Sequence, residues 1–219
     1  MMIRYVIFDM DGVLVDSEEA IRVASVKMFK KRGLKVLSED FLPFTGMGEN
    51  RFIGGVAEKY GLTFSAQMKD EAYAIYDEIA KEHVIVFEGI QNLARKLKEQ
   101  GYKLAVASAA DEVKVKINLR CMGLSKNDFD AVITGNDVTR HKPDPEVFLK
   151  ACEALKGTPE QAIVIEDAIA GCQAAKAAGM TCVGVMSTFD YNALKNAGAD
   201  FVVEKTTDVL TVLKNKAGD

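Results

Sequence analysis

The chain has 219 residues, of which 48% are hydrophobic and 27% are charged, and its net charge at pH 7 is −4. This composition is typical of a globular protein, and the length allows one large domain with a smaller one inserted into it. The sequence has no basic excess, no apolar run long enough to cross a bilayer, and no signal-peptide pattern at its start. We therefore expect no nucleic-acid or membrane partner, and predict a cytoplasmic monomer.

The four cysteines show no CxxC spacing, and the two histidines, His83 and His141, lie far apart in the sequence. Neither pattern fits a zinc site or a disulfide framework, so we expect reduced cysteines that pack in the core.

The first predicted element is an apolar strand that begins at Tyr5 and reaches Asp9. A mostly helical stretch follows, in which Ser17 is the expected N-cap and residues 41–48 form a loop. Its expected helices span residues 18–31, 49–60 and 65–82.

From Glu88 onward, helices alternate with continuous apolar strands. The expected strands are residues 103–107, 131–133, 162–165, 182–185 and 201–203. The expected helices are residues 90–98, 113–122, 145–155, 168–178 and 192–197. This alternation predicts an α/β fold with a Rossmann-like parallel sheet that is covered on both faces.

The connection between the first two core strands is longer than a crossover requires. A βαβ unit needs about 30 residues, and the helix at residues 90–98 already supplies the crossover. We therefore predict a core formed by residues 1–16 and 84–219, with residues 17–83 inserted as a helical cap. The insertion follows the carboxyl end of the first strand, where open α/β sheets bind ligands.

Polar side chains follow several of these strands and should meet at one edge of the sheet. Two carboxylates spaced i, i+2 in extended chain also face the same side. The candidate residues are Asp9 and Asp11 after the first strand, Ser108 after the second, Lys142 in a Lys-Pro-Asp-Pro turn, and the pair Glu166 and Asp167.

This set of side chains has a consistent chemistry. The carboxylates of Asp9, Asp11 and Asp167 are hard oxygen ligands that suit Mg²⁺. A phosphate dianion would bridge the metal, the Ser108 hydroxyl and the Lys142 ammonium. Asp9 would attack phosphorus, while Asp11 would protonate the leaving oxygen and then deprotonate the attacking water.

Each residue also has an ordinary structural interpretation when it is considered alone. Ser108 could be a turn or N-cap residue, Lys142 a solvated surface lysine, and Glu166 with Asp167 a cap for the next helix. Their joint occurrence at strand ends favours a site for phosphoryl transfer.

With these residues in place, the sequence resembles the haloacid dehalogenase superfamily, in the subgroup with a helical cap. The subgroup includes proteins similar to β-phosphoglucomutase and phosphoglycolate phosphatase. The matching positions are Asp9, Asp11, Gly12, Asp16, Ser108, Lys142, Glu166, Asp167 and Gly171. Residues 41–57 are also similar to the corresponding domain of plant chloroplast suppressor-of-quenching proteins.

The resemblance implies a Mg²⁺-dependent phosphatase that acts on a small phosphorylated metabolite. It implies that Asp9 is the nucleophile, that Asp11 is the acid and base, and that Asp167 binds the metal. It also implies that Asp11 reaches Mg²⁺ through its backbone carbonyl, with Glu166 as a nearby metal contact. The cap would supply substrate contacts from Ser17 and Arg51, although Arg51 could equally be a solvated helix residue.

Two other functions remain open. β-Phosphoglucomutases carry a histidine where this chain has Ile21 and a lysine where it has Tyr76, which weakens the alternative of a sugar-phosphate mutase. A phosphorylation-dependent binding domain uses a similar acidic pocket, hydroxyl and lysine. Such a domain has no need to enclose a substrate, so the predicted cap argues against it.

Overall fold

The computed structural model describes residues 2–44 and 48–217. The chain divides into two compact units, which we call the core unit (Met1–Val15 with Val86–Asp219) and the helical unit (Asp16–Ile85). Among the described residues, no helix combines the length and the apolar character that a membrane span requires.

The core unit is built on a sheet of six parallel strands in the order β5-β4-β1-β6-β7-β8. The strands are β1 (Tyr5–Phe8), β4 (Lys103–Ala107), β5 (Ala131–Ile133), β6 (Ala162–Glu166), β7 (Thr181–Val185) and β8 (Phe201–Val203). Every residue of β6 is buried, as expected for a central parallel strand that is covered on both faces. The predicted α/β fold with a parallel sheet is confirmed.

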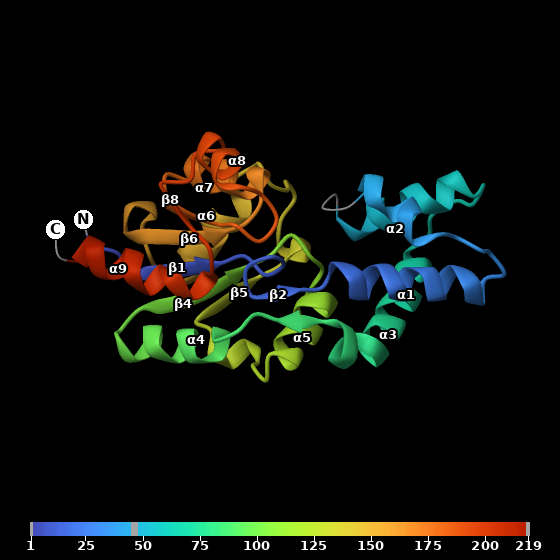
Figure 1. Ribbon diagram of the computed structural model, residues 1–219, viewed down its shortest axis with the longest axis horizontal. Helices are drawn as coiled ribbons and strands as arrows, with labels where there is room; N and C mark the ends of the chain where they lie inside the picture. Colours follow the sequence, from blue (N-terminus) through green and yellow to red (C-terminus); the bar gives the residue numbers. More distant parts are fainter. Residues whose placement is uncertain (1, 45–47, 218–219) are drawn as a thin grey trace. The chain divides into compact units, whose positions relative to one another are not determined.

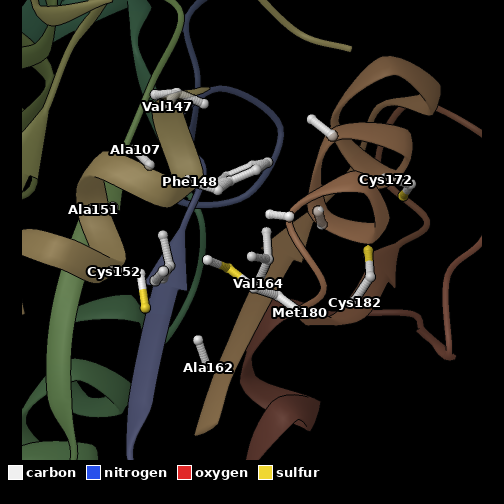
Figure 2. Packing of buried hydrophobic residues seen from close by; sticks show 14 of the residues in the cluster. Ala107, Val147, Phe148, Ala151, Cys152, Ala162, Val164, Cys172, Met180 and Cys182 are labelled. Carbon is white, nitrogen blue, oxygen red and sulfur yellow. The ribbon is translucent and has the colours of Figure 1, made fainter. Parts of the chain in front are cut away.

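Helices cover both faces of this sheet (Figure 1). On one face lie α6 (Glu146–Ala154), α7 (Ile169–Ala177) and α8 (Tyr191–Asn196), and on the other lie α4 (Ile90–Glu99) and α5 (Glu112–Cys121). Figure 2 shows the first layer, in which Phe148 of α6 and Cys172 of α7 belong to one buried cluster with Val164 of β6. The described cysteines are all free, and three of them are buried.

The helical unit contains α1 (Glu18–Lys31), a 3₁₀ helix (Ser38–Phe44), α2 (Glu49–Lys59) and α3 (Ala66–His83). Its core includes an aromatic series in which the ring centroids of Phe29 and Phe41 are 6.1 Å apart and those of Phe41 and Phe52 are 4.9 Å apart. The predicted loop at residues 41–48 is wrong in part, because residues 41–44 belong to the 3₁₀ helix. Residues 45–47 of that loop lie outside the described residues.

Two strands and one α-helix were not predicted from the sequence. Strands β2 (Val15–Asp16) and β3 (Ile85–Val86) form a separate two-stranded sheet, and α9 (Val209–Ala217) ends the described chain. Strands of two residues are too short to show an alternating pattern.

Candidate active site

The register of the central strands places several of the candidate residues at one edge of the core sheet. Phe8, the last residue of β1, pairs with Val106 of β4 and Ile165 of β6. The next residue, Asp9, donates its backbone N–H to the carbonyl of Ile165 at 3.0 Å. Asp9 therefore lies at the carboxyl end of the sheet, one residue beyond each of these pairs.

Three buried carboxylates gather at this edge. Asp9, Glu166 and Asp167 each offer a carboxylate oxygen, and these oxygens all lie within 4.8 Å of one another. Like charges this close in a buried site repel each other, so the group requires a cation or shared protons. All three residues were predicted from the sequence as parts of one site, and the structure brings them together.

The side chain of Lys142 places a cation beside these carboxylates. Its Nζ lies 2.5 Å from Asp9 Oδ1 and 2.6 Å from Glu166 Oε1, and its side chain is only 10% exposed. The ordinary interpretation of this lysine, a solvated surface residue, is wrong.

Glu166 connects this lysine to the start of helix α7. Its Oε1 accepts the bond from Lys142, while its Oε2 accepts the backbone N–H groups of Asp167 at 2.8 Å and Ala168 at 2.7 Å. A Cβ built on Gly171 would lie 1.8 Å from Glu166 Oε1, so only glycine leaves room for this side chain. Glu166 thus satisfies backbone donors near the helix start and also holds Lys142 toward Asp9.

Two residues that the sequence analysis missed hold the segments next to Asp167. The Thr188 hydroxyl donates to Asp167 Oδ2, and the Ser187 hydroxyl donates to the carbonyl of Gly12 at 2.5 Å. Both follow the end of β7 at Val185. They share the signal of the other candidates, which is a polar side chain shortly after a parallel strand.

The carboxylate of Asp11 points to a different partner. Its Oδ2 lies 3.0 Å from Nζ of Lys114, whose side chain is 6% exposed. Asp11 does not belong to the group of three carboxylates found among the described residues. Lys114 was also missed from the sequence, because one lysine in an amphipathic helix gives no signal of burial.

Ser108 is buried after β4, and its backbone N–H donates to the carbonyl of Ile133 at 3.0 Å. Its Oγ accepts the N–H of Ala110 at 3.1 Å, so its interpretation as a turn residue is also correct. The hydroxyl hydrogen can rotate toward another acceptor, because a serine hydroxyl both donates and accepts.

Burial governs the protonation of the acidic group. It raises the pKa of Asp9 well above its usual range, although Lys142 acts in the opposite direction. Burial, with the charge of Glu166, raises the pKa of Asp167 to about 7. Burial lowers the pKa of Lys142, but the charges of Asp9 and Glu166 outweigh that effect and raise it overall.

The donor set suits a hard divalent cation. Within the described part of the chain, Asp9 Oδ2 and Asp167 Oδ1 accept no hydrogen bond, whereas both oxygens of Glu166 do. Carboxylate oxygens with no nitrogen or sulfur donor among them favour Mg²⁺ over softer metals. Asp9 and Asp167 are thus the two carboxylates with an oxygen available for a metal.

The two predicted cap residues belong to the helical unit. Ser17 is buried at the N-cap position of α1 but accepts no capping bond there, and Asp16 Oδ1 accepts the N–H of Glu18 at 3.1 Å instead. Arg51 lies on α2, where its Nη1 is 2.9 Å from Glu58 Oε2 and its guanidinium is 5.1 Å from the ring centroid of Phe44.

Two buried residues occupy the positions at which β-phosphoglucomutases carry a histidine and a lysine. Ile21 of α1 is 3% exposed and Tyr76 of α3 is fully buried.

Known proteins are similar to this chain in sequence and in fold. A protein of Arabidopsis thaliana named Protein SUPPRESSOR OF QUENCHING 1, chloroplastic, is 44% identical over 202 residues, which cover 90% of this chain but 19% of that protein. Validoxylamine A 7'-phosphate phosphatase of Streptomyces hygroscopicus subsp. limoneus is 33% identical over 214 residues, which cover 95% of this chain and 96% of that protein. The crystal structure of β-phosphoglucomutase from Clostridium difficile has a TM-score of 0.78 at 26% identity and covers 99% of both chains.

A family model described as haloacid dehalogenase-like hydrolase matches residues 6–185. The match extends from the strand before Asp9 to the end of β7, and so includes Lys142 and the acidic pair at the end of β6. The chain therefore belongs to the haloacid dehalogenase-like hydrolase family.

Proposed function

We propose that the chain is a Mg²⁺-dependent phosphatase that hydrolyses a small phosphorylated metabolite through an aspartyl phosphate on Asp9. The observation that carries this proposal is the group of Asp9, Glu166 and Asp167 with Lys142 bonded to its first two members. The similarity to validoxylamine A 7'-phosphate phosphatase over nearly the whole of both chains supports the same class of reaction.

In the first half of the reaction, a carboxylate oxygen of Asp9 attacks phosphorus, and the bond from phosphorus to the leaving oxygen breaks. Asp11 gives its proton to that oxygen. The Lys142 ammonium and the Ser108 hydroxyl bind phosphate oxygens and keep the phosphorus in line with Asp9. Mg²⁺ bound by Asp9 and Asp167 would neutralise phosphate charge and reduce its repulsion from the carboxylates.

In the second half, water attacks the aspartyl phosphate and gives a proton to Asp11. The bond between phosphorus and Asp9 breaks, which releases inorganic phosphate and restores the starting carboxylate. Asp11 thus acts once as an acid and once as a base, so the cycle requires no other proton carrier.

We propose that residues 17–83 form the cap that selects the substrate, with Ser17 and Arg51 among its contacts. The buried positions of Ile21 and Tyr76 favour hydrolysis over a mutase reaction. A mutase must hold a bisphosphate in two orientations, and neither residue offers it a charged group.

The test is turnover of 4-nitrophenyl phosphate by the purified chain with Mg²⁺, with EDTA, and as the variant Asp9→Asn. We expect activity with Mg²⁺ alone, and loss of at least 10³-fold in the variant, since asparagine is a poor nucleophile. Asp16→Asn is the matched control, because asparagine retains the oxygen that accepts the N–H of Glu18. Equal activity in Asp9→Asn and the wild type would disprove the nucleophile assignment.

A panel of phosphorylated sugars separates the remaining alternatives. Release of inorganic phosphate supports a phosphatase, whereas bisphosphate-stimulated interconversion of hexose 1- and 6-phosphates would identify a mutase. A stable phosphoprotein that does not turn over would identify a binding domain.

A further inference from the structure

Lys114 occupies a position that helix stability does not explain. It lies in the first turn of α5, which begins at Glu112, and the positive end of the helix dipole disfavours a cation there. Its side chain is also only 6% exposed, and burying an ammonium is unfavourable without an opposite charge. Lysine at this position therefore requires a compensating group.

Asp11, which lies 103 positions earlier in the chain, is such a group. Lys114 Nζ is 3.0 Å from Asp11 Oδ2, within hydrogen-bond distance. The Asp11 side chain is 23% exposed, so Lys114 holds a partly accessible carboxyl through Oδ2.

Lys116, two residues further along the same helix, shows what an ordinary lysine of α5 does. Its side chain is 55% exposed and pairs with Glu112 at 3.1 Å, one helical turn away. A surface pair of this kind contributes little to stability. The two lysines therefore differ in two ways: Lys114 is buried and contacts a residue distant in sequence, whereas Lys116 is exposed and contacts its own helix.

We propose that Lys114 is a positioning residue for proton transfer by Asp11. Its bond to Oδ2 orients the Asp11 carboxyl and holds it outside the cluster of Asp9, Glu166 and Asp167. This role rests on the proposed phosphatase function, in which Asp11 is the acid and the base.

Proton transfer depends strongly on orientation, so a carboxyl that rotates freely should be a poorer acid. In the step concerned, Asp9 forms a bond to phosphorus, the bond from phosphorus to the ester oxygen breaks, and that oxygen takes the proton from the Asp11 carboxyl. A leaving group that is stable as an anion does not need this proton.

The experiment compares 4-nitrophenyl phosphate with phenyl phosphate in the wild type, Lys114→Met and Lys116→Met. The two esters are similar in shape, but phenolate is the poorer leaving group and needs the proton more. In Lys114→Met we expect kcat/KM for phenyl phosphate to fall about tenfold or more, and kcat/KM for 4-nitrophenyl phosphate to fall no more than about threefold. Lys116→Met should have the same kcat/KM as the wild type with both esters.

A second readout comes from the hydrolysis of the phosphoenzyme, in which Asp11 takes a proton from water whatever the substrate. For 4-nitrophenyl phosphate, kcat and KM should therefore fall together in Lys114→Met. Lys114→Arg, which retains a cation beside Asp11, should recover part of the loss.

A double-mutant cycle with Asp11→Asn tests whether Lys114 acts through Asp11. In the Asp11→Asn background, Lys114→Met should change kcat/KM for phenyl phosphate by less than about twofold. Equal losses with both esters, or full additivity in the cycle, would reduce Lys114 to a structural role and overturn the proposal. Absence of turnover by the wild type would overturn the phosphatase function and this role with it.

Discussion

Gly12 and Asp167 approach each other so closely that a Cβ built on Gly12 would lie 1.9 Å from Asp167 Oδ2. Gly12 also has φ of +76°, a conformation that side chains disfavour. Glycine is therefore required at position 12 for two reasons, which are its own backbone conformation and the space that the Asp167 carboxylate occupies. Its lack of a side chain leaves room for the carboxylate of Asp167, a proposed metal ligand.

We expect Gly12→Ala to displace the Asp167 carboxylate and so weaken Mg²⁺ binding. The loss should be about tenfold or more, comparable to that caused by disturbing groups that orient metal ligands. Isothermal titration with Mg²⁺ measures this affinity. The unfavourable φ should also lower the free energy of unfolding by about 1–2 kcal/mol.

Gly101→Ala separates the two effects. Gly101 has φ of +84°, and a Cβ there would meet no atom within 4 Å. This variant should show the loss of stability but bind Mg²⁺ as the wild type does. Equal weakening of Mg²⁺ binding in the two variants would contradict the steric explanation.

The raised pKa values in the acidic cluster predict how Mg²⁺ stabilises the protein at different pH. The pKa of Asp167, about 7, and that of Asp9 exceed the values near 4 expected in the unfolded chain. The metal-free protein should therefore lose stability as pH rises from about 4 through about 7, because the unfolded state releases these protons first.

Mg²⁺ competes with these protons, since its ligands must be ionised. The rise in Tm that Mg²⁺ produces should thus be small at about pH 5.5 and larger at about pH 8. Thermal unfolding with and without Mg²⁺ at both pH values provides the measurement. A rise that does not depend on pH would contradict the link, and Asp167→Asn should largely remove the rise.

Replacing Lys142 should leave two buried carboxylates without their shared cation. We expect Lys142→Met to lower the free energy of unfolding of the metal-free protein by about 3–5 kcal/mol at neutral pH, the usual effect of removing one partner from a buried ion pair. Lys142 lowers the pKa of Asp9, so its loss raises that pKa further. The deficit should therefore shrink as pH falls and Asp9 takes up a proton.

Urea unfolding at two pH values measures this deficit. Lys150→Met is the control, because Lys150 lies on α6, the helix that follows Lys142, is 42% exposed and pairs with Glu146 at 3.1 Å. The control should cost less than about 1 kcal/mol. A comparable loss in both variants would show that the buried carboxylates do not depend on Lys142.

The elements that were predicted well are those with strong local patterns. The helix at Glu18–Lys31 and the strands at Lys103–Ala107 and Phe201–Val203 match their predicted bounds, because apolar spacing and flanking turn residues define them. The 3₁₀ helix at Ser38–Phe44 has a proline inside it and no long repeat, so its sequence resembles a loop.

The same distinction applies to the site. Residues that directly follow apolar strands, such as Asp9 and Ser108, could be identified because parallel strands bring their carboxyl ends to one edge. Lys114 depends on a contact with a residue distant in sequence, and no local spacing reveals this partner. Nothing in the sequence separates Lys114 from the exposed Lys116.

The helical unit contains an ion pair with its own pH dependence. Asp40 accepts bonds from the Leu37 N–H at 2.8 Å, the Lys59 ammonium at 2.5 Å and the Tyr60 hydroxyl at 2.6 Å. These bonds join the 3₁₀ helix to the end of α2. The bond from Lys59, followed by that from Tyr60, lowers the pKa of Asp40 to about 2.

We expect Asp40→Asn to lower the Tm at neutral pH, because an amide replaces the charged acceptor of Lys59. The folded pKa of Asp40 lies below its unfolded value, so the stabilisation is present above about pH 4 and disappears as pH falls through about 2. The gap in Tm between variant and wild type should therefore close across that range, as followed by circular dichroism. Glu39→Gln removes a charge from the exposed neighbouring residue and should leave Tm unchanged. A gap of constant size down to pH 2 would mean that the charge of Asp40 does not stabilise the helical unit.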